Sequence, residues 1–300
     1  MIQVWVTGEV LIDLIPEGSD RKPIVGGGPA NTAKALAKIG IDIQFIDGIS
    51  TDDYGQMAKD ELISAGVKLD YVKFSDKPTC LAIVSLSDSG SASYEFIIEN
   101  TATFDFTSDW LPNPKSEGPS LLHIGTLATA IEPGASVLFE WAQSVAKVAP
   151  IVFDPNIRPA VIGDRKQYVM QVERWVSISS AVKVSDEDLK WLYPSLEIEQ
   201  VVNNWLAKGP SLIVVTRGDI GLAGYRVGEK VSVDAVKVVV ADTVGAGDTV
   251  GAIFVEAIVK DGLETLSGVR LEMMLKRAAN AAAITVSRTG ANPPTLKEIE

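Results

Sequence analysis

One stretch of the sequence, residues 242–254 (DTVGAGDTVGAIF), combines a glycine-rich turn, a carboxylate and an apolar helical pattern. The Gly-Ala-Gly turn at residues 245–247 has no bulky side chain, so its N–H groups can approach an anion, and the helix dipole adds to the attraction. Asp248 follows in the first helical turn. Two roles remain open for it: an acid favoured by the helix dipole, or a general base that takes the proton of a hydroxyl attacking a phosphoryl group.

Two nucleotide-binding patterns fit this stretch poorly. The spacing Gly245-x-Gly247-x-x-x-Gly251 is one residue off the dinucleotide fingerprint, and Asp248 would repel a pyrophosphate at the helix start. A dinucleotide-dependent oxidoreductase is therefore disfavoured. The chain also has no G-x-x-x-x-G-K-[ST] motif, so a nucleotide must be held in another way.

A second glycine run, GGGPANTAKALAKIG at residues 26–40, begins the other well-defined helix. Its three leading glycines allow close backbone approach or a positive φ. Asn31 lies at the helix entry, where its amide can donate to and accept from a substrate hydroxyl. A role as a helix cap alone is the alternative for Asn31.

The hydrophobic pattern predicts the elements that position these motifs. Helical periodicity is expected at residues 29–39, 248–260 and 270–287. Alternation of such helices with apolar β-rich runs predicts a three-layer α/β domain with a mostly parallel central sheet. The last predicted strand would run into the Gly-Ala-Gly turn, where such sheets bind ligands. Strands are expected at residues 2–7, 43–49, 120–124, 150–153, 211–216 and 236–241.

Two segments interrupt this alternation. Residues 10–25 and about 78–104 have the pattern of strands with polar alternation and no crossover helix. In the second segment, TCLAIVSL and ASYEFIIE flank DSGS, which is a hairpin signal. We expect a small β-sheet that stands off the main sheet as a lid over a site, with a decorated edge of the main sheet as the alternative.

Composition limits the possible functions. The chain has 27 Lys and Arg against 39 Asp and Glu, a net charge of −12, which argues against a nucleic-acid partner. Its single cysteine, Cys80, and single histidine, His123, exclude an intrachain disulfide and Cys/His zinc sites, and both are expected in the core. No apolar run reaches the ~20 residues of a membrane span, and the N-terminal residues lack a basic signal-peptide start. We therefore expect a cytoplasmic protein without a membrane partner.

In combination, GGGPANTAKALAKIG and DTVGAGD make the chain similar to the ribokinase/PfkB family of carbohydrate kinases. The resemblance extends from GEVLID at residues 8–13 to RTGANPP at residues 288–294. It implies a single kinase domain over residues 1–300, with a ribokinase-like fold and a lid formed by about 11–25 and 78–104. It also implies transfer of the γ-phosphoryl group of ATP to a sugar or nucleoside hydroxyl, with Mg²⁺.

The resemblance implies roles for residues around each motif. Asp248 would be the catalytic base, beside an anion hole formed by Gly245, Ala246 and Gly247. Taken without the family, Asp13 could instead be an exposed turn acid. The residues that would bind the acceptor sugar are Asp13, Gly27, Asn31 and, in DPNIR, Arg158.

The nucleotide would be held by two further regions, of which VTRGDIGLAGY (215–225) resembles the family's nucleotide loop and the alanine-rich helix would flank the adenine. Family members often have Asn-x-x-Glu where this chain has KVSDEDL, so Asp188 would order Mg²⁺ through water, with Glu187 as the alternative. Asp242 matches the position of a carboxylate for a monovalent cation such as K⁺. The implied ATP-binding residues are Lys183, Ser185, Thr216, Gly218, Gly221 and Asn280.

Within the family, GGGPANTA, SASYEFIIENTAT (91–103) and DPNIRPAVI most resemble fructokinases. This implies fructose as the acceptor and fructose 6-phosphate as the product, with 2-keto-3-deoxygluconate kinase and ribokinase as alternatives. A non-catalytic nucleotide or sugar sensor is the alternative from another class, and the presence of Asp248 argues against it. An exposed edge of the lid sheet would invite pairing with a second lid, so we expect a homodimer.

Overall fold

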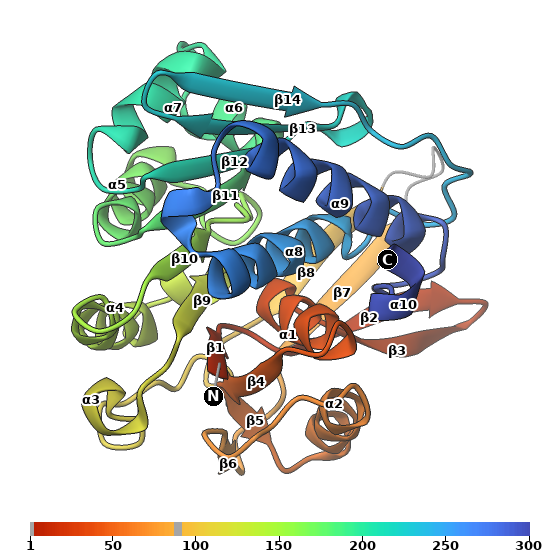
Figure 1. Cartoon of the computed structure of the whole chain (residues 1–300). Coiled ribbons are helices and arrows are strands. Elements are labelled where there is room, and N and C mark those ends of the chain that lie inside the picture. The colour runs from red at the N-terminus through yellow and green to blue at the C-terminus, as the bar shows by residue number, and fades with distance from the viewer. Residues whose placement is uncertain (1–2, 87–91) are drawn as a thin grey trace.

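The structure is a computed structural model that describes residues 3–86 and 92–300. Its centre is an eight-stranded sheet in which six strands run parallel and a hairpin is added antiparallel at one edge (Figure 1). The strand order is β14 (Glu229–Val233), β13 (Leu222–Arg226), β12 (Leu212–Thr216), β11 (Ala181–Ser185), β10 (Ile151–Asp154), β9 (Leu121–Gly125), β1 (Gln3–Thr7) and β4 (Asp42–Ile46).

Helices cover both faces of this sheet, so its central strands are apolar on both sides. In β1, Val4 and Val6 belong to one core and Trp5 belongs to the other. The first core packs under α1 (Gly28–Lys38), α2 (Asp53–Ser64), α8 (Ala246–Asp261) and α9 (Gly268–Val286). The second packs under α4 (Gly134–Val145), α5 (Arg165–Val176), α6 (Asp186–Leu192) and α7 (Ile198–Leu206). Figure 1 shows α9, α8 and α1 side by side across one face, and the predicted three-layer α/β fold is confirmed.

Four strands form a separate sheet, here called the small sheet. Its order is β3 (Asp20–Gly26), β2 (Leu11–Glu17), β7 (Leu81–Leu86) and β8 (Ala92–Ile97). The prediction of a small separate sheet is confirmed, and the alternative of a decorated edge of the main sheet is wrong. β7 and β8 pair antiparallel, as predicted, while the turn predicted at residues 88–91 lies outside the described residues.

Short elements complete the described chain. A two-stranded sheet pairs β5 (Gly48–Ser50) with β6 (Lys73–Ser75). No helix among the described residues is both long and apolar enough to cross a membrane. The remaining elements are α3 (Pro114–Glu117), α10 (Leu296–Ile299) and the 3₁₀ turns η1 (Thr126–Thr129), η2 (Gly218–Ile220) and η3 (Leu263–Thr265).

The strand predicted at residues 236–241 is wrong, because this segment is irregular. Val239 is 89% exposed, and the N–H groups of Ala241 and Asp242 donate to the carbonyl of Val286 at the end of α9. β14 already forms the edge of the main sheet, so the run of β-branched residues crosses the surface as a link to α8. The Gly-Ala-Gly turn therefore follows a loop and not a strand.

The other predicted strands and helices are present close to their expected bounds, with residues 43–49 divided between β4 and β5. Strand β11 was not predicted from the sequence, because Lys183 interrupts its apolar alternation. The β13–β14 hairpin, which carries polar residues on its exposed face, was not predicted either.

Candidate active site

A cavity of about 430 Å³ lies at the carboxyl end of the main sheet. β4 follows β1 on one side and β9 lies on the other, so the cavity occupies a topological switch point, where such sheets bind ligands. The small sheet and the N-terminal ends of α1 and α8 complete its wall. It is lined by Glu9, Leu11, Asp13, Gly27, Gly28, Asn31, Phe96, Leu127, Asn156, Arg158, Lys183, Thr243, Val244, Gly245, Gly247 and Asp248.

Asp248 lies in the first turn of α8 and is only 8% exposed. Its carboxylate accepts a hydrogen bond from Asn31 Nδ2 at 2.9 Å, which joins α8 to α1. Burial raises the pKa of Asp248 to about 6, although the Lys183 ammonium and the Asn31 hydrogen bond oppose the rise. A dipole-favoured surface acid would need neither the burial nor the partner on α1. A buried carboxylate of near-neutral pKa suits a general base.

Asn31 is not a helix cap, so that alternative is wrong. Gly27 is the N-cap of α1, and the N–H of Asn31 already donates to the Gly27 carbonyl within the helix. The Oδ1 atom of Asn31 is buried and has no partner in the described part of the chain. A buried acceptor normally has a donor, and a substrate hydroxyl would supply one here. Sugar binding by Asn31 stays a prediction.

The turn before α8 exposes backbone N–H groups to the cavity. Gly245 has a φ of 78°, the left-handed conformation that favours glycine. The first hydrogen bond of the helix runs from the N–H of Thr249 to the Gly245 carbonyl at 2.9 Å, so the N–H groups of Gly247 and Asp248 have no intrahelical acceptor. The N–H of Ala246 contacts the Thr243 carbonyl at 3.4 Å, and Ala246 does not line the cavity. An anion bound at this turn would therefore face the N–H groups of residues 247 and 248, and the role of the turn as an anion hole stays a prediction.

Lys183 supplies a positive charge beside this turn. Its Nζ atom forms an ion pair with Asp154 Oδ2 at 2.9 Å, and both side chains are buried. Burial lowers the pKa of Lys183, but the carboxylates of Asp154 and Asp248 outweigh that effect and raise the pKa above its usual value. A Cβ atom at Gly247 would lie 2.9 Å from Lys183 Nζ, so a larger residue there would force the ammonium to shift.

Asp13 and Arg158 lie on another part of the cavity wall. Asp13 is in strand β2, so the alternative of an exposed turn acid is wrong. Burial raises its pKa to about 6, while Arg158 and Lys34 oppose the rise. Arg158 Nη1 donates to Asn156 Oδ1 at 2.7 Å, which fixes the guanidinium. A carboxylate and a guanidinium can together bind the hydroxyl groups of a polar substrate.

The other residues predicted to bind ATP do not line this cavity. Ser185 and Thr216 are register partners at the carboxyl ends of β11 and β12, and Ser185 Oγ also caps α6. Gly218 and Gly221 follow β12 with φ values of 52° and 112°. Asn280 is exposed on α9. Ser185 and Thr216 share the sheet edge that also carries Lys183, and the nucleotide role of all five residues stays a prediction.

Asp188, the acid expected to serve Mg²⁺, lies near this edge. Its Oδ1 atom accepts a hydrogen bond from the N–H of Ile157 at 3.1 Å, and burial raises its pKa. Glu187 is exposed, so Asp188 is the better placed of the two. Carboxylate oxygen suits a hard cation. Among the described residues no group of three or more His, Cys, Asp or Glu could hold a metal ion, so substrate phosphates and water would have to complete the coordination.

Asp242 fixes the loop before the turn. One carboxylate oxygen accepts a hydrogen bond from the N–H of Val244 at 3.0 Å, and the other accepts one from the N–H of Gly290 at 2.9 Å. The residue was expected at the end of a strand, and the structure places it in the irregular loop instead. Its role toward a monovalent cation stays a prediction.

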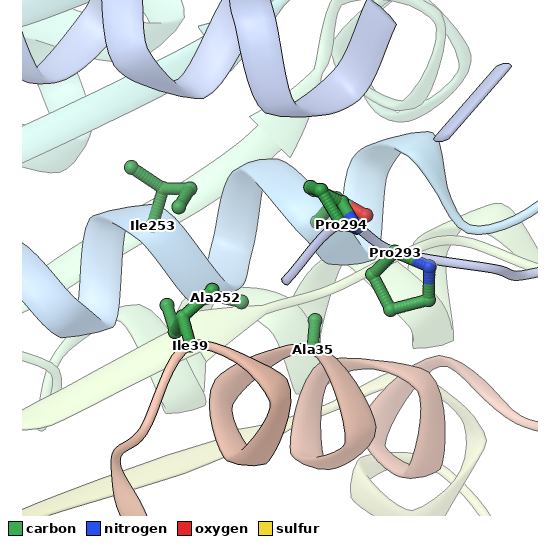
Figure 2. Close-up of a pocket in the computed structure, with 7 residues that line it drawn as sticks. Ala35, Ile39, Ala252, Ile253, Pro293 and Pro294 are labelled. Carbon is green, nitrogen blue, oxygen red and sulfur yellow. The ribbon is translucent and has the colours of Figure 1, made fainter. Parts of the chain in front are cut away.

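The segment after α9 packs behind the same turn. A Cβ atom at Gly245 would lie 2.8 Å from the Cβ of Ala291. Pro293 and Pro294 follow and, together with residues of α1 and α8, line a small apolar notch (Figure 2). Thr249 Oγ1, which also lines the notch, donates to the Gly245 carbonyl at 2.9 Å. The shape of the turn thus depends on two helices and on this distant segment.

Several cavity residues were not predicted. Glu9 and Asn156 lie inside GEVLID and DPNIR, the segments that carried the resemblance, and Phe96 lies in the stretch 91–103. Leu11 belongs to the predicted lid, whereas nothing in the local sequence marks Leu127. Glu9, Leu127 and Asn156 share a position just after a parallel strand, which becomes visible only once the strand order is known.

His123 and Cys80 are buried, as predicted. Burial lowers the pKa of His123 to about 4, so the imidazole is neutral, and its Nδ1 has no hydrogen-bond partner in the described structure. Burial raises the pKa of the Cys80 thiol far above its usual value, which makes it a poor nucleophile.

Known proteins resemble the chain in sequence and in structure. The fructokinase of Rhizobium leguminosarum bv. trifolii is 34% identical over 263 residues, 86% of this chain and 80% of that protein. The structure of fructokinase with bound ATP from Xylella fastidiosa has a TM-score of 0.91 at 24% identity and covers 99% of this chain and 96% of that one. A Vibrio cholerae O395 fructokinase double mutant with fructose, ADP and potassium ion bound has a TM-score of 0.83 at 25% identity, with 97% and 94% covered.

One match decides the family. The model of the "pfkB family carbohydrate kinase" matches residues 1–298, nearly the whole chain. The expected resemblance is therefore confirmed, and the chain belongs to the pfkB family of carbohydrate kinases.

Proposed function

We propose that the protein transfers the γ-phosphoryl group of ATP to the 6-hydroxyl of fructose, giving fructose 6-phosphate and ADP. The observation that carries the proposal is the Asn31–Asp248 pair, buried in one cavity with Lys183 and the free N–H groups of the turn. It combines a base with an anion site, as phosphoryl transfer requires. Fructose is favoured because the Rhizobium leguminosarum bv. trifolii relative, 34% identical to this chain, is a fructokinase.

The acceptor side of the reaction uses groups of the cavity wall. Asp13 and Arg158 bind sugar hydroxyls, and Asn31 Oδ1 accepts the hydrogen bond for which it has no partner within the described chain. The 6-hydroxyl is then oriented toward Asp248. As the oxygen of that hydroxyl bonds to phosphorus, Asp248 takes its proton and the bond to the ADP oxygen breaks, with the electron pair leaving on ADP.

The phosphoryl side uses Lys183 and the N–H groups of residues 247 and 248, which stabilise the negative charge of the transferred group. Mg²⁺, when bound, neutralises phosphate charge, and Asp188 would hold it through water. A K⁺ ion at Asp242 would fix the loop before α8 without touching the substrate. ATP extends from Lys183 along the ends of β11 and β12, with Ser185, Thr216, Gly218, Gly221 and Asn280 as its remaining partners.

The small sheet acts as a lid in this proposal, within a single kinase domain. Leu11, Asp13 and Phe96 from it reach the cavity, which supports a closure that excludes water. Its edge strands, β3 and β8, would pair with those of a second copy in a homodimer. We place the protein in the cytoplasm in this proposal, because ATP is available there for the reaction.

The test of the function is kcat/KM with ATP and Mg²⁺ across fructose, 2-keto-3-deoxygluconate, ribose, glucose and adenosine. We expect the highest value for fructose and ³¹P NMR of the product to show phosphate on the 6-oxygen. A higher kcat/KM for 2-keto-3-deoxygluconate or ribose would show that fructose is not the preferred acceptor, while the assignment as a sugar kinase would stand. Binding of ATP and sugar without any product would instead make the protein a sensor.

A further inference from the structure

Thr126 has an unusual backbone conformation at the edge of the cavity. Among the described residues, the non-glycine residues with positive φ are Asn100, Thr126 and Asn156, and Thr126 has a φ of 59°. Asparagine tolerates this region, whereas a β-branched residue there is strained. Such strain is of order 1–3 kcal/mol and persists only where the surroundings enforce it. The residue follows β9 directly, at the topological switch point.

The carboxylate of Glu9 is what holds this conformation. Glu9 Oε1 accepts a hydrogen bond from Thr126 Oγ1, and Oε2 accepts one from the N–H of Ala128 at 3.2 Å. The residue is 3% exposed, and burial raises its pKa. No ion pair involves Glu9 in the part of the chain that the structure describes. A buried carboxylate without an ion pair is costly, and the hydrogen bonds from Thr126, from Ala128 and from its own backbone N–H, together with the more distant charge of Arg158, compensate for that cost.

The segment held in this way forms part of the wall near the catalytic base. A Cβ atom at Gly28 would lie 2.9 Å from Thr126 Cγ2 and 3.4 Å from Asp248 Oδ1, so Gly28 separates the two by little more than its own backbone. Leu127, the next residue, lines the cavity. The main chain of Glu9 also abuts the sugar side, because a Cβ atom at Gly27 would lie 2.3 Å from the Glu9 carbonyl oxygen.

We propose that Glu9 is a positioning residue that clamps Thr126 in its left-handed conformation and thereby sets the wall formed by residues 126–128 against the acceptor sugar. Glu9 acts through Thr126 and Leu127. Its loss therefore affects the sugar and not ATP. The inference rests on the proposed function for its kinetic test.

The kinetic test compares Glu9→Leu with Glu9→Gln. Leucine has similar size and neither hydrogen bond. Glutamine keeps both, because its Oε1 accepts from Ala128 while its Nε2 donates to a reversed Thr126 hydroxyl. We expect Glu9→Leu to raise the KM for fructose at least ~10-fold, since a misplaced wall can cost up to ~10²-fold, with the KM for ATP unchanged. Glu9→Gln should stay near wild type. Equal changes in both KM values, or no rescue by glutamine, would overturn the proposal.

A double variant tests whether the effect of Glu9→Leu on the KM for fructose depends on Thr126. Glycine adopts the left-handed conformation without strain, so Glu9→Leu should cost clearly less in a Thr126→Gly background than in wild type. Additive losses would contradict the clamp. If Glu9→Leu does not fold, Thr126→Val takes its place, because it removes the hydroxyl that donates to Glu9. Thr126→Ser, which keeps the hydroxyl, is then the control.

A structural readout separates this inference from the proposed function. In a crystal structure of sugar-free Glu9→Leu or Thr126→Val, we expect residue 126 to leave the left-handed region and Leu127 to move from its wild-type position. An unchanged segment 126–128 would overturn the proposal whatever the substrate is. A wild-type enzyme inactive on every sugar would refute the proposed function only, and the crystal structures would still decide the role of Glu9.

Discussion

At the scale of residues, the site depends on how burial tunes its carboxylates. Desolvation raises the pKa of Asp248 to about 6, which would strengthen it as a base, and Lys183 and Asn31 keep the rise moderate. A higher pKa would leave the base protonated at neutral pH. A lower pKa would weaken its drive to take the proton. The balance depends on the distance of 2.9 Å between Asn31 Nδ2 and Asp248 Oδ2.

The pH dependence of activity follows from these pKa values. In the proposed function Asp248 would act as a base only when ionised, and Asp13, whose pKa is also raised to about 6, would bind hydroxyls best when ionised. The free-enzyme kcat/KM for fructose should therefore be constant above pH ~7 and fall as the pH drops through about 6, with a slope of log kcat/KM between one and two. A profile that is flat from pH 8 to pH 5 would contradict both assignments.

Gly247 tests the place of the lysine. In Gly247→Ala the new methyl group would lie 2.9 Å from Lys183 Nζ, so the ammonium must move away from the anion site. We expect kcat to fall at least ~10-fold, less than the ~10²–10³-fold typical of a lost oxyanion donor. The helix should not suffer, because alanine is the better helix former.

The matched control is Gly251→Ala on the same helix. The nearest atoms to its Cβ would lie 3.9 Å away, which is ordinary contact. This variant should keep wild-type kcat. If both variants lost activity alike, the helix and not Lys183 would explain the result.

At the scale of elements, the site is assembled where separate units meet. α1 and α8 present their N-terminal ends to one cavity, β10 and β11 contribute Asp154 and Lys183, and the small sheet closes another side. The small sheet is hydrogen-bonded as a unit of its own. Such a unit can change its distance from the main sheet while its internal pairing stays intact.

Hydrogen exchange measures this motion. Residues 11–26, 81–86 and 92–97 should exchange more slowly when fructose and a non-hydrolysable ATP analogue are added together, because closure excludes water from the strands. Amides of α7, which packs against β12 and does not line the cavity, serve as the internal control and should not change. If hydrogen exchange slowed only outside the small sheet, the small sheet would not be a lid.

At the scale of the whole molecule, much of the fold was predictable because burial on both faces leaves a strong apolar pattern in parallel strands. That pattern failed at residues 236–241, where a β-branched run crosses the surface and only the strand order shows that no place in the sheet is left for it. Strand β11 was missed for the opposite reason: it belongs to the sheet but lacks a fully apolar pattern. Lys183 inside it is charged and pairs with Asp154 on the neighbouring strand.

The site was predictable where a motif is local. Asp248 and Asn31 lie in two glycine-rich motifs, yet their hydrogen bond spans 217 positions and no spacing rule contains it. Glu9 and Leu127 became visible only through the adjacency of β1 and β9. Local chemistry can be read from sequence, whereas contacts between chain segments require the fold.

The most direct test of the whole account is the kcat of Asp248→Asn with fructose and ATP. Asparagine keeps the size and can pair with Asn31 but cannot take the proton, so kcat should fall ~10²–10⁴-fold. ATP affinity should stay equal or tighten, because a negative charge near the phosphates is gone. Stability should not drop, because a buried charge has been removed. If a folded Asp248→Asn enzyme kept more than about a tenth of wild-type kcat, above the range for a lost general base, Asp248 would not be the catalytic base.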